Sequence, residues 1–206
     1  MRRLMLLRHA KTERPEGGQR DRDRKLTKRG RADAPAIGAY MARHGLVPEV
    51  ALVSPAKRAQ ETWELVAETF AKPPPLVTED RIYNASTETL IEVVGETRGA
   101  HGVLVIGHNP GLHDVAVRLS VTGDVEARER LAEGLPTAGL VVIDLAFDDW
   151  ARARLPGDLE PGMGIVDILN EAAVRFAGWD RYPGVPRLPR RSEAETGRSE
   201  GQIDEE

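Results

Sequence analysis

Short apolar segments alternate with helical patterns through most of this 206-residue chain, and this alternation constrains the fold more than any other feature of the sequence. Such segments suit strands that are buried on both faces of a parallel sheet. The alternation therefore predicts an α/β fold, a three-layer sandwich in which helices flank a mostly parallel central sheet. The expected strands cover roughly residues 3–8, 50–53, 75–78, 103–107 and 139–145.

Helical patterns fill the intervals between the expected strands. Thr27 is expected to open a helix that ends near His44, and Pro35 inside it is expected to kink the helix or delay its start. Ser54 and Pro55 are expected to be the N-cap and the first residue of a second helix. Two further helices are expected to begin after Ser86 and after Asn109-Pro110.

The chain is long enough for one domain with a sizeable core, and we expect that domain to span residues 1–182. The apolar run 165–168 is interpreted as one more edge strand. Three prolines follow from Pro183 onward, with mixed charges and almost no apolar residues after them. Residues 183–206 are therefore expected to form a disordered, charged tail.

Composition argues against several functional classes. The formal net charge of -4 leaves no excess of cations for binding nucleic acid. The absence of cysteine excludes disulfides, thiolate zinc sites and iron–sulfur clusters. There is no apolar run of about 18 residues, the length that a membrane-spanning helix needs. The apolar run after Arg2-Arg3 is too short for a secretory signal. We therefore expect a cytoplasmic protein that binds neither nucleic acid nor membranes.

Arginine and histidine residues follow the ends of three expected strands. Arg8-His9 ends the first strand, Arg58 lies in the helix after the second, and His108 follows the fourth. Ligands of open α/β sheets bind at this edge. Guanidinium groups bind phosphoryl oxygens, and they also disfavour a neighbouring imidazolium, so that an imidazole stays free to attack. The pattern predicts a phosphoryl group held by Arg8, Arg58 and His108 and attacked by His9.

Each of these residues also has an ordinary structural interpretation. A histidine after a strand is usually structural, an arginine in a first helical turn is usually solvated, and His108 could be a turn residue. Arg58 is more informative, because a cation at a helix N-terminus opposes the helix dipole unless an anion lies between them. No metal or other cofactor is expected, since His108 and His113 are five residues apart with no acidic cluster beside them.

A long polar loop, residues 11–25, comes directly after His9 and has Gly17-Gly18 at its centre. Its position is compatible with a mobile lid or a loop that faces the substrate. A plain solvated connection explains its composition equally well.

Four segments follow one another along the chain: Leu6–Lys11 with its R-H-[GA] signature, Leu26–Gly30, Val53–Thr62 and Val105–Pro110. In this order they resemble motifs of the histidine phosphatase superfamily, also called the phosphoglycerate mutase-like fold. The similarity covers about residues 1–150. The short chain, the segment Pro136–Gly139 and Trp150 look most like the SixA-type phosphohistidine phosphatase branch.

This resemblance implies that His9 is the nucleophile and becomes phosphohistidine, and that Arg8, Arg58 and His108 form the phosphate pocket. Related mutases carry a general-acid glutamate where this chain has Asp80. The shorter aspartate either donates the proton or only caps a turn or pairs with Arg81. Two further residues, Lys11 and Asn84, are expected to contact the substrate.

The expected function is that of a metal-independent phosphatase with a covalent phosphohistidine intermediate. A phosphohistidine on a partner protein, such as a phosphotransfer domain, is the favoured substrate, because a nitrogen leaving group needs a general acid less than an alkoxide does. The short span between Arg58 and His108 also leaves little room for a capping insertion, which favours an open site. The alternatives are a phosphatase of a small phosphomonoester, such as a sugar or cofactor phosphate, and a phosphate-binding or phosphoprotein-binding module without turnover.

Overall fold

The structure, a computed structural model, describes residues 1–15, 17–120, 122–123, 125–154 and 164–169. The strands in this part of the chain form one sheet with the order β3-β2-β4-β1-β6-β7-β5. The strands are β1 (Arg2–Arg8), β2 (Val50–Val53), β3 (Leu76–Thr78), β4 (Gly102–Gly107), β5 (Thr122–Gly123), β6 (Leu140–Leu145) and β7 (Gly164–Leu169).

The sheet is mostly parallel, as expected. β1, β4, β2 and β3 run in the same direction, whereas β6 is antiparallel to both of its neighbours, β1 and β7. The bounds of the first five expected strands agree with the structure to within one residue. The run 165–168 also forms a strand, but the prediction that it lies at the sheet edge is wrong, because β5 pairs with its outer side.

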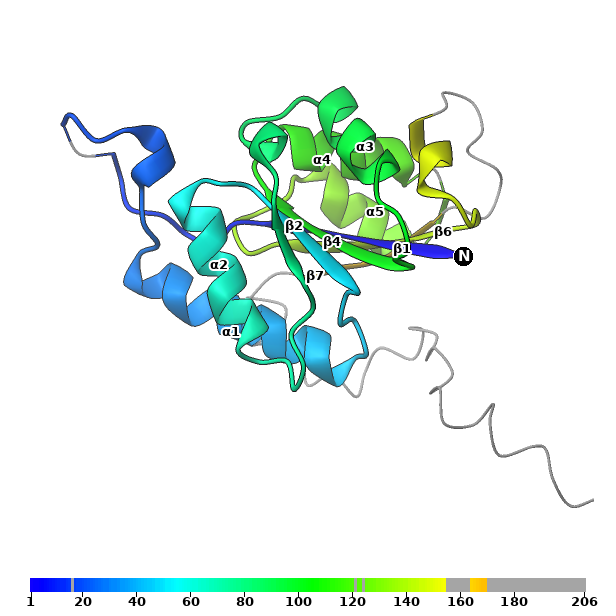
Figure 1. The fold of residues 1–206 in the computed structure, drawn as a ribbon, viewed down its shortest axis with the longest axis horizontal. Helices are drawn as coiled ribbons and strands as arrows, with labels where there is room; N and C mark the ends of the chain where they lie inside the picture. Colours follow the sequence, from blue (N-terminus) through cyan, green and yellow to red (C-terminus); the bar gives the residue numbers. More distant parts are fainter. Residues whose placement is uncertain (16, 121, 124, 155–163, 170–206) are drawn as a thin grey trace, which may run out of the picture.

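Helices cover both faces of the sheet, which confirms the expected α/β sandwich (Figure 1). Helices α1 and α2 lie on one face, and α3, α4 and α5 lie on the other. None of the helices described is long and apolar enough to cross a membrane. The helices are α1 (Lys28–Arg43), α2 (Lys57–Ala67), α3 (Thr87–Gly95), α4 (Gly111–Leu119) and α5 (Val125–Ala132), with short 3₁₀ turns η1 (Asp21–Asp23), η2 (Asp80–Ile82) and η3 (Trp150–Arg154).

Alternate residues of β1 belong to the two separate cores. Leu4 and Leu6 pack in the core beneath α3, α4 and α5, whereas Met5 and Leu7 pack in the core beneath α1 and α2. This alternation is the period of two that a strand imposes on its side chains. The apolar residues of β1 are buried on both faces of the sheet. The strand therefore fixes the position of Arg8 and His9 at the carboxyl edge of the sheet.

Three of the expected helix starts are confirmed. Thr27 caps α1 by accepting a hydrogen bond from the Gly30 amide, and Pro35 lies inside this helix without delaying its start. Ser86 caps α3 in the same way, accepting from the Thr89 amide. Helix α4 begins directly after Asn109-Pro110.

The prediction for α2 is wrong by two residues, since Ala56 is the N-cap rather than Ser54. The backbone amide of Ser54 still donates to the Ile106 carbonyl of β4 at 3.0 Å. The chain is therefore still tied to the sheet at Ser54 and turns into the helix later. The tail expected over residues 183–206 lies outside the described residues.

Candidate active site

His9, Arg58 and His108 come together at the carboxyl edge of the sheet. His9 follows β1, His108 follows β4, and Arg58 stands in the first turn of α2. The imidazole rings of His9 and His108 have centroids 5.1 Å apart, and Arg58 Nη2 lies 3.3 Å from His108 Nδ1. All three residues are nearly buried, with 8%, 4% and 5% of their surface exposed for His9, Arg58 and His108.

Arg8, the last residue of β1, lies close enough to influence both imidazoles. Its charge contributes to lowering the pKa of His9 and of His108, although burial and the Arg58 charge contribute more. Its Nη1 donates to the Leu135 carbonyl at 2.9 Å. The Nε atoms of Arg8 and Arg58 are buried and make no hydrogen bond to the described residues. Each of these two guanidinium groups therefore has one N–H that no described residue accepts.

His9 is a neutral imidazole. Burial lowers its pKa to about 4, and the positive charges of Arg58, Arg8 and Arg24 act in the same direction. Its Nδ1 lies 2.9 Å from the Ala10 carbonyl oxygen. A carbonyl only accepts hydrogen bonds, so Nδ1 carries the ring proton. The lone pair therefore resides on Nε2, the nitrogen that can attack an electrophile.

His108 is also neutral, because burial lowers its pKa to about 3 with help from His9 and Arg58. Arg58 can only donate, so Nδ1 of His108 accepts from it and Nε2 carries the proton. Nε2 then donates to Ser54 Oγ at 2.8 Å. One hydrogen bond of the His108 ring therefore orients Arg58, and the other, to Ser54, fixes the orientation of the ring itself. In this state its single N–H group points to Ser54 and not toward a phosphoryl oxygen.

The backbone around His9 is tied to both neighbouring elements. The His9 amide donates to the Gly107 carbonyl at 3.2 Å. Thr62 in α2 accepts from the Ala10 amide at 3.0 Å and donates to the Arg58 carbonyl at 2.7 Å. Thr62 is fully buried. This hydroxyl therefore links the strand that carries His9 to the helix that carries Arg58.

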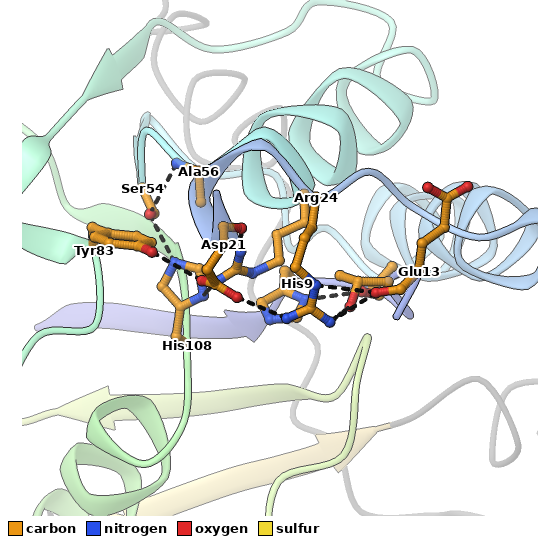
Figure 2. Close-up of polar contacts among 11 residues, drawn as sticks. His9, Glu13, Asp21, Arg24, Ser54, Ala56, Tyr83 and His108 are labelled. Carbon is orange, nitrogen blue, oxygen red and sulfur yellow. Dashed lines mark hydrogen bonds and ion pairs between the residues drawn. The ribbon is translucent and has the colours of Figure 1, made fainter. Parts of the chain in front are cut away.

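Asp21 is a residue of the site that the sequence analysis did not identify. It lies in η1, inside the polar loop, and its Oδ2 accepts from Arg58 Nη2 at 2.9 Å and from the Tyr83 hydroxyl at 2.9 Å. Its Oδ1 accepts from Arg24 Nη1 at 2.8 Å. Figure 2 shows Asp21 beside Tyr83, His108 and Arg24. Hydrogen bonds from Arg24 and Tyr83, together with the Arg58 charge, hold the pKa of Asp21 well below its ordinary value.

Through Asp21, the described part of the polar loop contacts Arg58 and Tyr83, so it is more than a plain solvated connection. Its base is closed by a bridge between Thr12 and Leu26, and the Leu26 amide donates to Glu61 Oε2 at 2.8 Å. Arg24 also donates to the Glu13 carbonyl and to Thr12 Oγ1. The only signal of this role in the sequence was that the loop begins directly after His9.

The structure shows no direct polar contact between the other three expected site residues and this cluster within the described residues. Asp80 is exposed and pairs with Arg22 at 3.0 Å. In the described part of the chain, no hydrogen bond or ion pair joins Asp80, Lys11 or Asn84 to His9, Arg58 or His108. The suggestion that Asp80 pairs with Arg81 is wrong, because that arginine binds Glu79 and Glu96.

Asn84 and Lys11 each have a role in the local backbone structure. Asn84 has a φ of 51°, a left-handed conformation that asparagine adopts more readily than most residues. Lys11 is exposed, and its carbonyl accepts from the Thr27 amide at 2.9 Å. A Cβ on Gly30 would lie 2.2 Å from the same carbonyl oxygen. This close approach requires glycine at position 30.

The residues that the structure describes contain no group of three or more histidine, aspartate or glutamate side chains arranged to hold a metal ion.

Comparison with known proteins identifies related sequences. The family profile described as "Histidine phosphatase superfamily (branch 1)" matches residues 4–87. An uncharacterized protein of Mycobacterium tuberculosis (strain H37Rv) is 34% identical over 159 residues, which is 76% of this chain and 93% of the relative. An uncharacterized protein of Mycobacterium leprae (strain TN) is 31% identical over 154 residues, 72% of this chain and 92% of the relative.

Solved structures show the same fold. A candidate phosphohistidine phosphatase SixA of Agrobacterium tumefaciens superposes with a TM-score of 0.67 at 28% identity, covering 82% of this chain and 97% of that one. The protein histidine phosphatase SixA complexed with tungstate gives a TM-score of 0.62 at 18% identity, covering 84% of this chain and 99% of that one. The second likeness, at this low identity, concerns the fold alone.

Proposed function

Because this chain belongs to branch 1 of the histidine phosphatase superfamily, we propose that it is a metal-independent phosphatase that forms a covalent phosphohistidine on His9. The observation that carries the proposal is the neutral, nearly buried imidazole of His9 beside Arg58 and His108. A module that only bound phosphate would gain from a protonated histidine, which adds a cation. The low pKa of His9 instead suits a nucleophile, which needs its lone pair.

The proposed reaction uses the side chains of this site in two steps. Arg8 and Arg58 bind the phosphoryl oxygens and stabilise the charge of the transition state. His9 Nε2 attacks phosphorus in line, and the bond from phosphorus to the leaving atom breaks with its electron pair on that atom. Water then attacks the phosphohistidine, which releases inorganic phosphate and restores neutral His9.

The substrate that the site favours is a phosphohistidine on a partner protein. An alkoxide leaving group needs a general acid, and the carboxyl groups near this site are poor candidates: Asp80 is exposed and paired, and Asp21 has a lowered pKa. A phosphorylated imidazole that carries a proton on its other nitrogen leaves as a neutral ring without such an acid. The 28% identity to the Agrobacterium protein agrees with this substrate.

A trapping experiment tests the nucleophile. The full chain is incubated with radiolabelled phosphoramidate, quenched, and assayed for a protein-bound phosphate that is labile in acid and stable in base. We expect the label on His9, its loss in His9→Ala, and its retention in His101→Ala, which changes an exposed histidine that precedes β4. Label that persists in His9→Ala would contradict the proposal.

A substrate comparison tests the leaving group. Hydrolysis of a histidine-phosphorylated phosphotransfer domain is measured beside hydrolysis of a panel of sugar and cofactor phosphates. We expect the highest kcat/KM with the phosphohistidine protein. A higher kcat/KM with one of the phosphomonoesters would favour the small-molecule alternative.

A further inference from the structure

A carboxylate of the protein itself is bound to the cations of the proposed phosphoryl site. Three donors from separate segments converge on the Asp21 carboxylate: Arg24 in the polar loop, Arg58 in α2 and Tyr83 after η2. Guanidinium and hydroxyl donors around two oxygens are also the chemistry that binds a phosphoryl group. Asp21 therefore resembles a bound anion more than a surface residue.

We propose that Asp21 is a specificity-determining residue that competes with the substrate phosphoryl group for Arg58 and Tyr83, and that the two anions exchange when substrate binds. The proposal rests on the proposed function, since it takes the cations around His9 to be the phosphoryl site. Asp21 then sets the affinity for substrate without taking part in the bond changes.

The hydrogen-bonding capacity of Arg58 is the first argument. Its Nη2 has two protons, and these reach Asp21 Oδ2 at 2.9 Å and His108 Nδ1 at 3.3 Å. Its Nη1 donates to the Asp21 carbonyl oxygen at 2.7 Å. A phosphoryl oxygen can therefore bind Nη2 only if one existing partner leaves, and Asp21 is the partner with an alternative.

The alternative for Asp21 is solvent, which is the second argument. Its side chain is 47% exposed, whereas that of Arg58 is 4% exposed. Rotation of the Asp21 side chain toward water would free Arg58 and Tyr83 while the contact from Nη1 to the Asp21 backbone remains. The incoming phosphoryl group takes the place of the carboxylate on Arg58, so the buried guanidinium is not left without an acceptor.

Charge explains why the exchange favours a phosphoryl group. Asp21 carries one negative charge, and a phosphoryl group at neutral pH carries close to two. The lowered pKa of Asp21 keeps its carboxylate ionised, so it acts as a competing anion and not as a proton donor. An incoming ligand therefore has to interact with the cations more strongly than a monoanionic carboxylate does, which selects for dianions.

The experiment compares two substitutions in the same 3₁₀ turn. Asp21→Asn keeps the shape and removes the competing charge. Asp23→Asn is the matched control, because Asp23 pairs with Arg20 at 2.8 Å. Binding of inorganic phosphate to the full chain is measured by isothermal titration, and kcat and KM are measured with phosphoramidate.

We expect Asp21→Asn to bind phosphate about two- to fivefold more tightly, to lower KM by a similar factor and to leave kcat unchanged. The Asp23→Asn variant should match the wild type. Weaker or unchanged phosphate binding in Asp21→Asn would overturn the proposal, as would a fall in kcat at unchanged phosphate affinity. Phosphate titration needs no turnover, so this result is independent of whether His9 is phosphorylated.

Discussion

The two ends of the central sheet use arginine in different ways. At the amino end of β1, Arg3 makes two parallel hydrogen bonds to Asp144, both 2.6 Å long. At the carboxyl end, Arg8 has no ion pair in the described part of the chain, and Arg58 pairs with Asp21, whose side chain is 47% exposed.

This difference separates an arginine that completes the fold from one that is prepared for a ligand. The guanidinium of Arg3 is matched by a planar carboxylate, the geometry in which such a pair is strongest. At the carboxyl end, by contrast, the carboxylate that pairs with Arg58 is about half exposed. An anion that binds there can therefore gain guanidinium donors that no buried carboxylate occupies.

Of the predicted changes, Arg58→Ala should cause the largest loss of activity. We expect kcat/KM to fall by about 10²–10³-fold, because a guanidinium that stabilises the phosphoryl charge is removed. Steady-state kinetics and phosphate titration measure the change, and urea unfolding verifies that the variant is folded.

Arg3→Ala is the matched substitution at the other end of β1. It should leave kcat/KM unchanged and lower the free energy of unfolding by about 1 kcal/mol, the value expected for a partly exposed pair. Equal losses of activity in the two variants would break the distinction between the two ends.

Acid should destabilise the carboxyl end. Because burial lowers the pKa of His9 from 6.5 to about 4, the unfolded chain binds a proton between these values that the folded chain does not. The free energy of unfolding should therefore fall by about 2 kcal/mol from pH 7 to pH 5 through this residue. Urea unfolding at both pH values measures it, and His9→Gln should show a smaller fall. An equal fall in the variant would contradict the lowered pKa.

Ser54→Ala should have a smaller effect. It removes the acceptor for His108 Nε2, which leaves a buried N–H group without its partner. We expect a loss of about 1 kcal/mol of stability and an approximately tenfold lower kcat/KM. Ser120→Ala is the control, since the buried Ser120 hydroxyl makes no hydrogen bond to the described residues. A loss of activity as large in the control would show that the effect is not specific to His108.

Asp80→Asn should have the smallest effect. Its exposed carboxylate pairs with Arg22, so we expect kcat to change by less than about twofold with a phosphohistidine substrate. Kinetics across pH 5 to 9 measure it. A large fall in kcat, with loss of the basic limb of the pH profile, would restore Asp80 as the general acid.

Local patterns were sufficient for most of the fold. Apolar runs located the expected strands to within one residue, and for β1, β4 and β6 the reason is that a strand buried on both faces can contain little else. Thr27 and Ser86 were identified as caps because their hydroxyls satisfy amides only three residues away. Ser54 has the same chemistry, but its backbone stays bonded to β4 and its hydroxyl serves His108, which local sequence does not reveal.

The sequence alone determined the alternation of strands and helices apart from β5 and α5, and it placed Arg8, His9, Arg58 and His108 at strand ends. These features depend on periodicity and on the rule that parallel strands end at one edge. Only the tertiary structure decided which carboxylate meets the arginines. Asp21 is separated from Arg58 by 37 residues, and Asp80 is nearer in sequence. How the polar loop reaches Arg58 and Tyr83 depends on long-range contacts, and no local pattern encodes them.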